Sequence, residues 1–164
     1  YSKGWHRGAS PCLVSVLGVL SHRKSARGCR KAVPLWRQTT KTMDIRYLII
    51  HCSATRETQR ASVEDIDRWH RQRGYRCIGY HYYITRDGVV HKGRAEGTVG
   101  AHCKGYNACS LGICYEGGLD AQGRPADTRT DAQRQSLIDL LRQLLLRYPS
   151  ARIIGPRETG AKKA

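Results

Sequence analysis

Residues 45–52, IRYLIIHC, decide the fold, because a run of β-branched and aromatic side chains predicts a buried strand. The strand continues into IIHCSAT (residues 49–55), where the apolar run ends in His51 and Cys52 and small hydroxylated residues follow. A strand that ends this way delivers its imidazole to the rim of a sheet, where histidine commonly binds metal or takes part in catalysis. His51 is therefore the first candidate site residue.

Helical and strand patterns alternate along the rest of the chain. Ser62 is a good N-cap for a helix that Gly74 would end. Thr130 and Gln133 form a capping-box pair at the start of the clearest helix, which carries one broad apolar stripe. The expected strands cover residues 45–52, 78–85, 89–92, 110–116 and 152–155, and the expected helices start near residue 62 and cover 131–148. This order predicts an α/β fold with a single mixed β-sheet flanked by helices.

The formal charge of +16 is concentrated at the start of the chain. Residues 1–42 hold nine of the 29 Lys and Arg residues and none of the 13 acids. They show no sustained amphipathic period, so we expect a disordered basic leader or a non-native upstream extension before a domain over residues 43–164. The apolar run at residues 12–20 is too short to span a bilayer, and no cleavage site follows it, so an export signal is unconvincing. No nucleic-acid motif accompanies the charge, and we expect no specific nucleic-acid partner.

Seven cysteines occur without a C-x-x-C pair, which disfavours a zinc ribbon or a thioredoxin-type motif. The simplest interpretation is reduced thiols in a monomer made in the cytoplasm, with a disulfide among the five cysteines after residue 42 left open.

Three histidines are placed where the elements could bring them together. His51 ends the first strand, His81 lies in the second, and His102 lies in a Gly-rich loop over residues 94–109. Long loops in compact domains are often functional. His70 and His91 are assigned to a helix face and to the surface of a hairpin.

Five motifs, in this order, resemble the type-2 N-acetylmuramoyl-L-alanine amidases, the bacteriophage lysozyme-type enzymes related to animal peptidoglycan recognition proteins. They are IIHCSAT (49–55), WHRQRGY (69–75), GYHYYITRDG (79–88), VGAHCKGYN (99–107) and SLGICYEGG (110–118). The resemblance implies a mixed sheet with flanking helices and a groove that binds peptidoglycan. It also implies one zinc ion, held by two histidines and one cysteine, for hydrolysis of the amide between the lactyl group of muramic acid and L-alanine.

The resemblance assigns roles residue by residue. His51 matches the first zinc histidine, Tyr80 the catalytic tyrosine and Lys162 the catalytic lysine. The remaining matches, which we expect to contact substrate, are His81, His102 and Asn107.

The C-terminal segment departs from the family pattern. Phage-type members carry a histidine after the last short strand, a lysine six residues later and a cysteine two beyond that. Here Pro156, Lys162 and Ala164 occupy these positions, so two expected zinc ligands are absent. The domain is C-terminally incomplete because it lacks these two ligands. Three explanations are open: a ligand that lies further along the chain, an altered reading frame, or true divergence. Zinc is expected to bind weakly or not at all, and a non-catalytic peptidoglycan-binding module is the alternative function.

Overall fold

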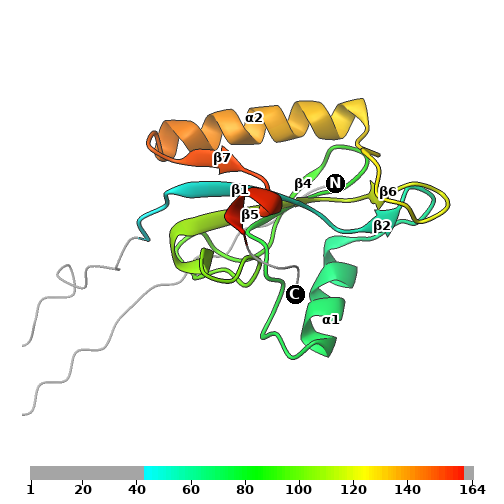
Figure 1. Cartoon of the computed structure of the whole chain (residues 1–164), viewed down its shortest axis with the longest axis horizontal. Helices are drawn as coiled ribbons and strands as arrows, with labels where there is room; N and C mark the ends of the chain where they lie inside the picture. Colours follow the sequence, from blue (N-terminus) through cyan, green and yellow to red (C-terminus); the bar gives the residue numbers. More distant parts are fainter. Residues whose placement is uncertain (1–42, 161–164) are drawn as a thin grey trace, which may run out of the picture. The chain divides into compact units, whose positions relative to one another are not determined.

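The structure is a computed structural model that describes residues 43–160. The expectations for residues 1–42, for Lys162 and for Ala164 lie outside the described residues. A central sheet carries one helix on each face, as Figure 1 shows, which confirms the expected α/β class with a mixed sheet.

The central sheet has five strands in the order β4-β3-β5-β1-β7. Their bounds are β1 Tyr47–Cys52, β3 Tyr82–Ile84, β4 Val90–Lys92, β5 Ser110–Tyr115 and β7 Arg152–Ile154. Strand β1 pairs in parallel with β5 and β7, β3 pairs in parallel with β5, and β4 is antiparallel to β3. The first half of β1, Tyr47–Ile49, thus lies between two parallel neighbours, which fits its apolar composition. A second, two-stranded parallel sheet joins β2 (Thr55–Arg56) to β6 (Gly118–Leu119) and was not expected.

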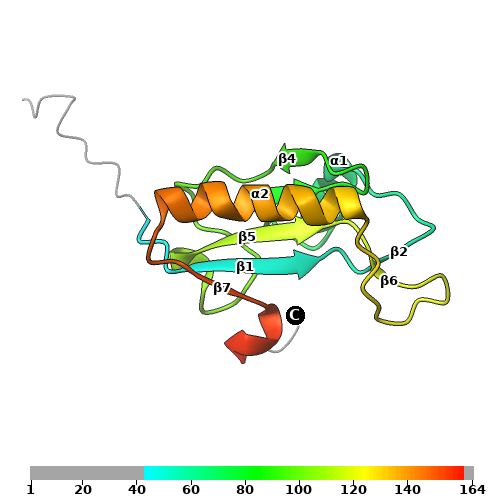
Figure 2. The ribbon, with the colours of Figure 1, turned by 90° about the horizontal axis from the view of Figure 1, so that it is seen from above.

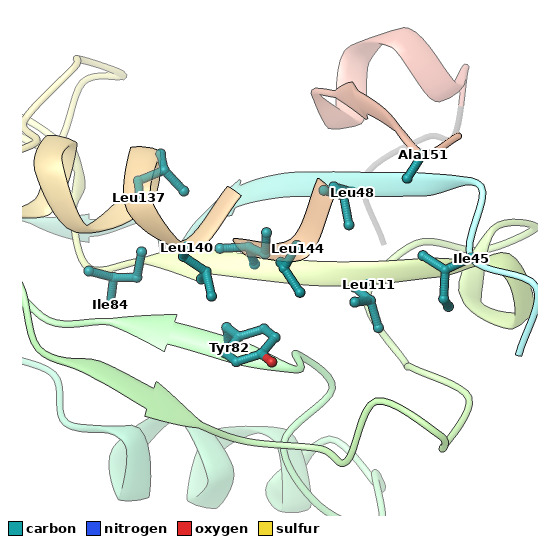
Figure 3. Close-up of a cluster of buried hydrophobic side chains, with 10 residues drawn as sticks. Ile45, Leu48, Tyr82, Ile84, Leu111, Leu137, Leu140, Leu144 and Ala151 are labelled. Carbon is teal, nitrogen blue, oxygen red and sulfur yellow. The ribbon is translucent and has the colours of Figure 1, made fainter. Parts of the chain in front are cut away.

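Helix α2 (Asp131–Arg147) covers one face of the sheet (Figure 2). Its capping box is present: the Thr130 hydroxyl accepts from the Gln133 N–H, and the Gln133 side chain accepts from the Thr130 N–H, both at 3.1 Å. The apolar stripe of α2 packs on side chains from the sheet (Figure 3). The buried members of this cluster are Ile45, Leu48, Tyr82, Ile84, Leu111, Ile113, Leu137, Leu140, Leu144 and Ala151.

Helix α1 (Val63–Gln72) lies on the other side of the sheet (Figure 1). Ser62 caps it as expected, in a capping box with Asp65. Ile66 and His70, one turn apart, are buried against the sheet. The helix ends at its C-cap, Arg73, just before Gly74, which adopts a φ of 85° that favours glycine.

The strand expected at residues 78–85 is shorter, with β3 limited to Tyr82–Ile84. The preceding segment bonds partly to the loop instead: the Ala101 N–H donates to the Gly79 carbonyl at 3.0 Å. A Cβ on Gly79 would lie 2.2 Å from the Ala101 oxygen, so the two backbones touch. Tyr80 and His81 therefore stand just before the strand rather than within it.

Two short 3-10 turns complete the part of the chain that the structure describes, η2 (Asn107–Cys109) and η3 (Pro156–Thr159). The five cysteines between residues 43 and 160 are all unpaired. No helix in the same range is long and apolar enough to cross a membrane.

Candidate functional site

The candidate site lies on the face of the sheet opposite α2. Side chains alternate along a strand, and Leu48 packs into the α2 core while Ile49 belongs to a separate cluster with Ile154. His51 follows Ile49 by two residues and so shares its face. On the neighbouring strand β5, the same alternation places Gly112 on this face.

Five aromatic rings adjoin one another on this face, and we call them the ring cluster. Successive ring centroids are 5.2 Å apart from His70 to Tyr80, 5.3 Å from Tyr80 to His51 and 5.1 Å from His51 to His102. His81 completes the cluster, 5.7 Å from His102. The cluster unites four of the five sequence motifs, since His70 belongs to WHRQRGY (69–75).

Glycines make room for the ring of His102. A Cβ on Gly112 would lie 2.5 Å from the His102 Cγ atom, and one on Gly100 would lie 2.5 Å from its Cδ2 atom. Any larger residue at either position would displace the ring. The glycines of the VGAHC and SLGIC motifs thus have a local steric explanation.

The hydrogen bonds of His81 fix its protonation. The Gly112 N–H donates to His81 Nδ1 at 3.0 Å, and His81 Nε2 lies 3.0 Å from the Thr98 carbonyl oxygen. A carbonyl oxygen can only accept, so the proton of His81 is on Nε2. His81 thereby ties β5 to the Gly-rich loop.

The hydrogen bonds of Ser110 and His102 determine which of the two rings, His51 or His102, donates to the other. The Ser110 hydroxyl donates to the Tyr106 carbonyl at 2.7 Å, so it can accept from His102 Nε2, which is 3.4 Å away. His102 Nδ1 is then the acceptor nitrogen, and it lies 3.1 Å from His51 Nε2. His51 therefore donates its Nε2 proton to His102.

Burial keeps the ring cluster neutral. It lowers the pKa of His51 to about 4. Burial, together with His51 and His81, lowers the pKa of His102 to about 3. Burial also raises the pKa of Tyr80, so the phenol stays protonated at neutral pH. At neutral pH the cluster is a set of uncharged rings with fixed donors and acceptors.

Asn107 holds the loop that carries His102. Its side-chain oxygen accepts from the backbone N–H groups of His102, at 2.9 Å, and Cys103, at 2.8 Å. The Cys103 thiol lies 3.5 Å from the Thr159 hydroxyl in η3. The loop is thus fixed at its base and joined to the C-terminal segment.

Pro156 begins the turn η3, which follows β7 and lies against β1. In the β1–β7 register Ile49 pairs with Ile154, and Gly155 continues in an extended conformation. The paired register ends at Ile154, so η3 follows at the end of the sheet where β1 reaches His51. The family expectation places a second zinc histidine at residue 156, and proline has no donor to offer.

The described side chains do not fit a three-ligand zinc site. Between residues 43 and 160 no three His, Cys, Asp or Glu side chains are grouped closely enough to hold a metal ion. Zinc in proteins is held by three or four such ligands. The thiol of Cys103 faces Thr159 rather than completing a set with His51 and His102.

Residues 41–163 match the sequence family described as N-acetylmuramoyl-L-alanine amidase. The chain belongs to this amidase family. It is 41% identical over 125 residues to an endolysin of Klebsiella phage KP32, a match that covers 76% of this chain and 83% of that endolysin. The amidases are hydrolases, and the resemblance carried by the five motifs is confirmed.

Solved structures agree with this assignment. The N-acetylmuramoyl-L-alanine amidase LysC from Clostridium intestinale URNW is 31% identical, with a TM-score of 0.62 over 71% of this chain and 72% of that one. The bumblebee protein PGRP-SA is 29% identical, with a TM-score of 0.59 over 70% of this chain and 71% of that one. The amidase fold is therefore shared by enzymes and by recognition proteins.

The structure brings together four of the residues that the sequence singled out in this amidase domain: His51, Tyr80, His81 and His102. It places Asn107 under the loop. His70, assigned from sequence to a helix face, was missed as a neighbour of the site. Its Nδ1 accepts from the Gly79 N–H at 2.9 Å, and its ring adjoins Tyr80. The signal available in the sequence was its position four residues after Ile66, which places both side chains on the same face of the helix.

Proposed function

We propose that this amidase-family chain recognises peptidoglycan at the bond between the lactyl group of muramic acid and L-alanine, and that it hydrolyses this bond slowly or not at all. The observation that carries the proposal is the contrast within one site. The ring cluster is complete, whereas Pro156 holds the position at which the family pattern has a second zinc histidine. Recognition can persist without the metal, while hydrolysis by the zinc route of the lineage needs ligands that Pro156 and Ala164 do not supply.

The ring cluster suits a sugar–peptide substrate. Tyr80, His102 and Asn107 are partly exposed, so their edges are available to a ligand. A cavity of about 410 Å³ adjoins the cluster at His81 and is also lined by Lys92 and Arg94. Neutral rings with fixed hydrogen-bonding atoms are suited to bind hydroxyl and amide groups by stacking and by hydrogen bonds.

Several further roles belong to the same proposal. Tyr80 and Lys162 would act in any residual hydrolysis, and His102 would contact substrate. His81, expected from the sequence to contact substrate, is buried with both ring nitrogens bonded to the backbone, so it would hold the loop beside His102 instead. Action on the cell wall after synthesis in the cytoplasm, as a monomer, fits the lineage of the chain.

The first test is retention on insoluble peptidoglycan, with and without a chelator. We expect the purified chain to be retained equally in both conditions, because the ring cluster needs no metal to keep its geometry. In parallel, the turbidity of purified cell walls should fall slowly or not at all. Absence of retention contradicts recognition, and chelator-sensitive retention with rapid lysis contradicts the inferred loss of zinc.

Asn107 offers a sharper test, because only its oxygen is engaged with the loop. We expect Asn107→Asp to keep most peptidoglycan retention, since a carboxylate can accept from the same two N–H groups. Asn107→Ala leaves these donors without their partner and should weaken retention about tenfold, the equivalent of one net hydrogen bond. Retention assays on both variants, with thermal unfolding as a fold control, measure the difference. If Asn107→Asp loses retention as Ala does, Asn107 acts directly on substrate through its amide N–H groups.

A further inference from the structure

The guanidinium of Arg94 bonds to two separate segments that border the ring cluster. Its Nε donates to the Ile78 carbonyl at 3.1 Å, and its Nη2 lies 3.4 Å from the Cys77 carbonyl, both just before Tyr80. Its Nη1 donates to the Val99 carbonyl at 2.6 Å, three residues before His102. One side chain therefore connects the segment that leads to the tyrosine with the segment that leads to the histidine.

The backbone around Arg94 strengthens this connection. The Arg94 N–H donates to the Tyr80 carbonyl at 2.9 Å, and the Gly93 N–H donates to the His81 carbonyl at 2.9 Å. The backbone contact between Gly79 and Ala101 joins the same two segments directly. The backbone of Arg94 is thus held by hydrogen bonds, while its side chain connects the segment before Tyr80 with the segment before His102.

The Arg94 side chain is used as a hydrogen-bonding fork rather than as an ion-pair partner. None of the ion pairs found between residues 43 and 160 includes it. Its three side-chain bonds all go to backbone carbonyls. Only a planar guanidinium has enough donors in a fixed plane to reach three carbonyls, whereas an ammonium group is compact and has no such plane.

We propose that Arg94 is a positioning residue, which sets the separation between Tyr80 and His102 and thereby the shape of the substrate-binding face. This inference rests on the proposed recognition of peptidoglycan. Without the fork, the Cys77–Tyr80 and Val99–His102 segments lose their shared anchor. His102 can then move from the Gly112 cradle, and its hydrogen bond with His51 weakens.

The test compares Arg94→Lys and Arg94→Ala with a matched control, Arg142→Lys. Arg142 is an exposed residue of α2, on the opposite face of the sheet, and it pairs with Asp139 at 3.5 Å. We expect both Arg94 variants to bind insoluble peptidoglycan about tenfold more weakly than the unchanged chain, the equivalent of one net hydrogen bond. The control should bind unchanged. Arg94→Lys keeps the positive charge, so weaker binding by this variant reports the loss of the guanidinium hydrogen bonds rather than the loss of charge.

Two further readouts separate positioning from a general loss of fold. Imidazole ¹⁵N spectra of the Arg94→Lys variant should show the signals of His51 and His102 shifted, because the Nε2–H···Nδ1 bond between them changes. Methylguanidinium, which can occupy the space that the side chain vacates and bond to the same carbonyls, should restore part of the binding of Arg94→Ala. Thermal unfolding shows whether each variant is folded. If Arg94→Ala is not folded, Arg94→Lys alone tests the positioning role.

The outcomes distinguish this inference from the proposed function. Unchanged imidazole signals in Arg94→Lys overturn the positioning role, whatever the binding result. Changed signals together with an unchanged chain that fails to bind peptidoglycan support the positioning role and contradict the proposed recognition. Where the unchanged chain does bind peptidoglycan, equally tight binding by Arg94→Lys overturns the positioning role alone.

Discussion

Replacing Pro156 with histidine and Ala164 with cysteine is expected to give this chain tight zinc binding and the ability to lyse cell walls. Residue 156 begins η3, which lies against β1 and follows the paired residue Ile154 by two positions, so we expect a histidine there to share a metal with His51. Loss of even an outer hydrogen-bond partner of a zinc ligand costs about 10–100-fold in affinity. Restoring two direct ligands should therefore raise zinc affinity by more than about 100-fold. Calorimetric titration with zinc measures the affinity, and loss of turbidity of purified walls measures the hydrolysis.

A matched control uses the next residue along the chain. Arg157 is exposed, and it follows by one residue the position at which the family pattern has a zinc histidine. Arg157→His combined with Ala164→Cys should give no comparable gain in zinc affinity. A folded, zinc-loaded variant with His at 156 and Cys at 164 that still fails to lyse walls contradicts hydrolysis by the route of the lineage.

Acid is expected to destabilise the domain between about pH 6.5 and pH 4, because buried His51 is neutral in the folded chain. The pKa of His51 falls from 6.5 to about 4 on folding. The unfolded chain therefore takes up the proton first as pH decreases, which favours unfolding. The stabilisation is fully present above pH 6.5 and is lost by about pH 4, a change of about 3 kcal/mol. His102, whose pKa falls to about 3 on folding, adds to the loss in the same direction. Since whole domains are stable by only about 5–15 kcal/mol, this change is large.

Urea unfolding measured at intervals from pH 7.5 to pH 4.5 tests this expectation. The Arg129 side chain holds the pKa of Asp127 below its usual range. Carboxylates of this kind lose their contribution to the free energy of unfolding at a lower pH than the histidines do. Changes between pH 7.5 and pH 4.5 are therefore assigned to histidine. His102→Asn removes one of the buried imidazoles and should therefore flatten the dependence on pH. A free energy of unfolding that is constant across the window would show that the ring cluster is not held neutral by burial.

Local signals in the sequence were sufficient for the main elements. The capping residues Ser62 and Thr130 were identified from sequence because a cap and its partner lie three residues apart. The leucine stripe of α2 and the apolar run of β1 were equally clear, since their periods are set by the geometry of one element. The second strand was predicted too long, because the contact between Gly79 and Ala101 joins segments that are far apart in the sequence.

The residues alone were enough to predict the family, the mixed sheet and the identities of the histidines and tyrosine that could form a site. They also showed that Pro156 and Ala164 cannot bind zinc, because neither side chain has a donor atom. The folded chain was needed to show that His51 donates to His102, that His70 adjoins Tyr80 and that the turn beginning at Pro156 lies against β1. It also revealed Arg94 as the link between the two sides of the site. These relations depend on strand register and on contacts between distant segments, which no local pattern of residues encodes.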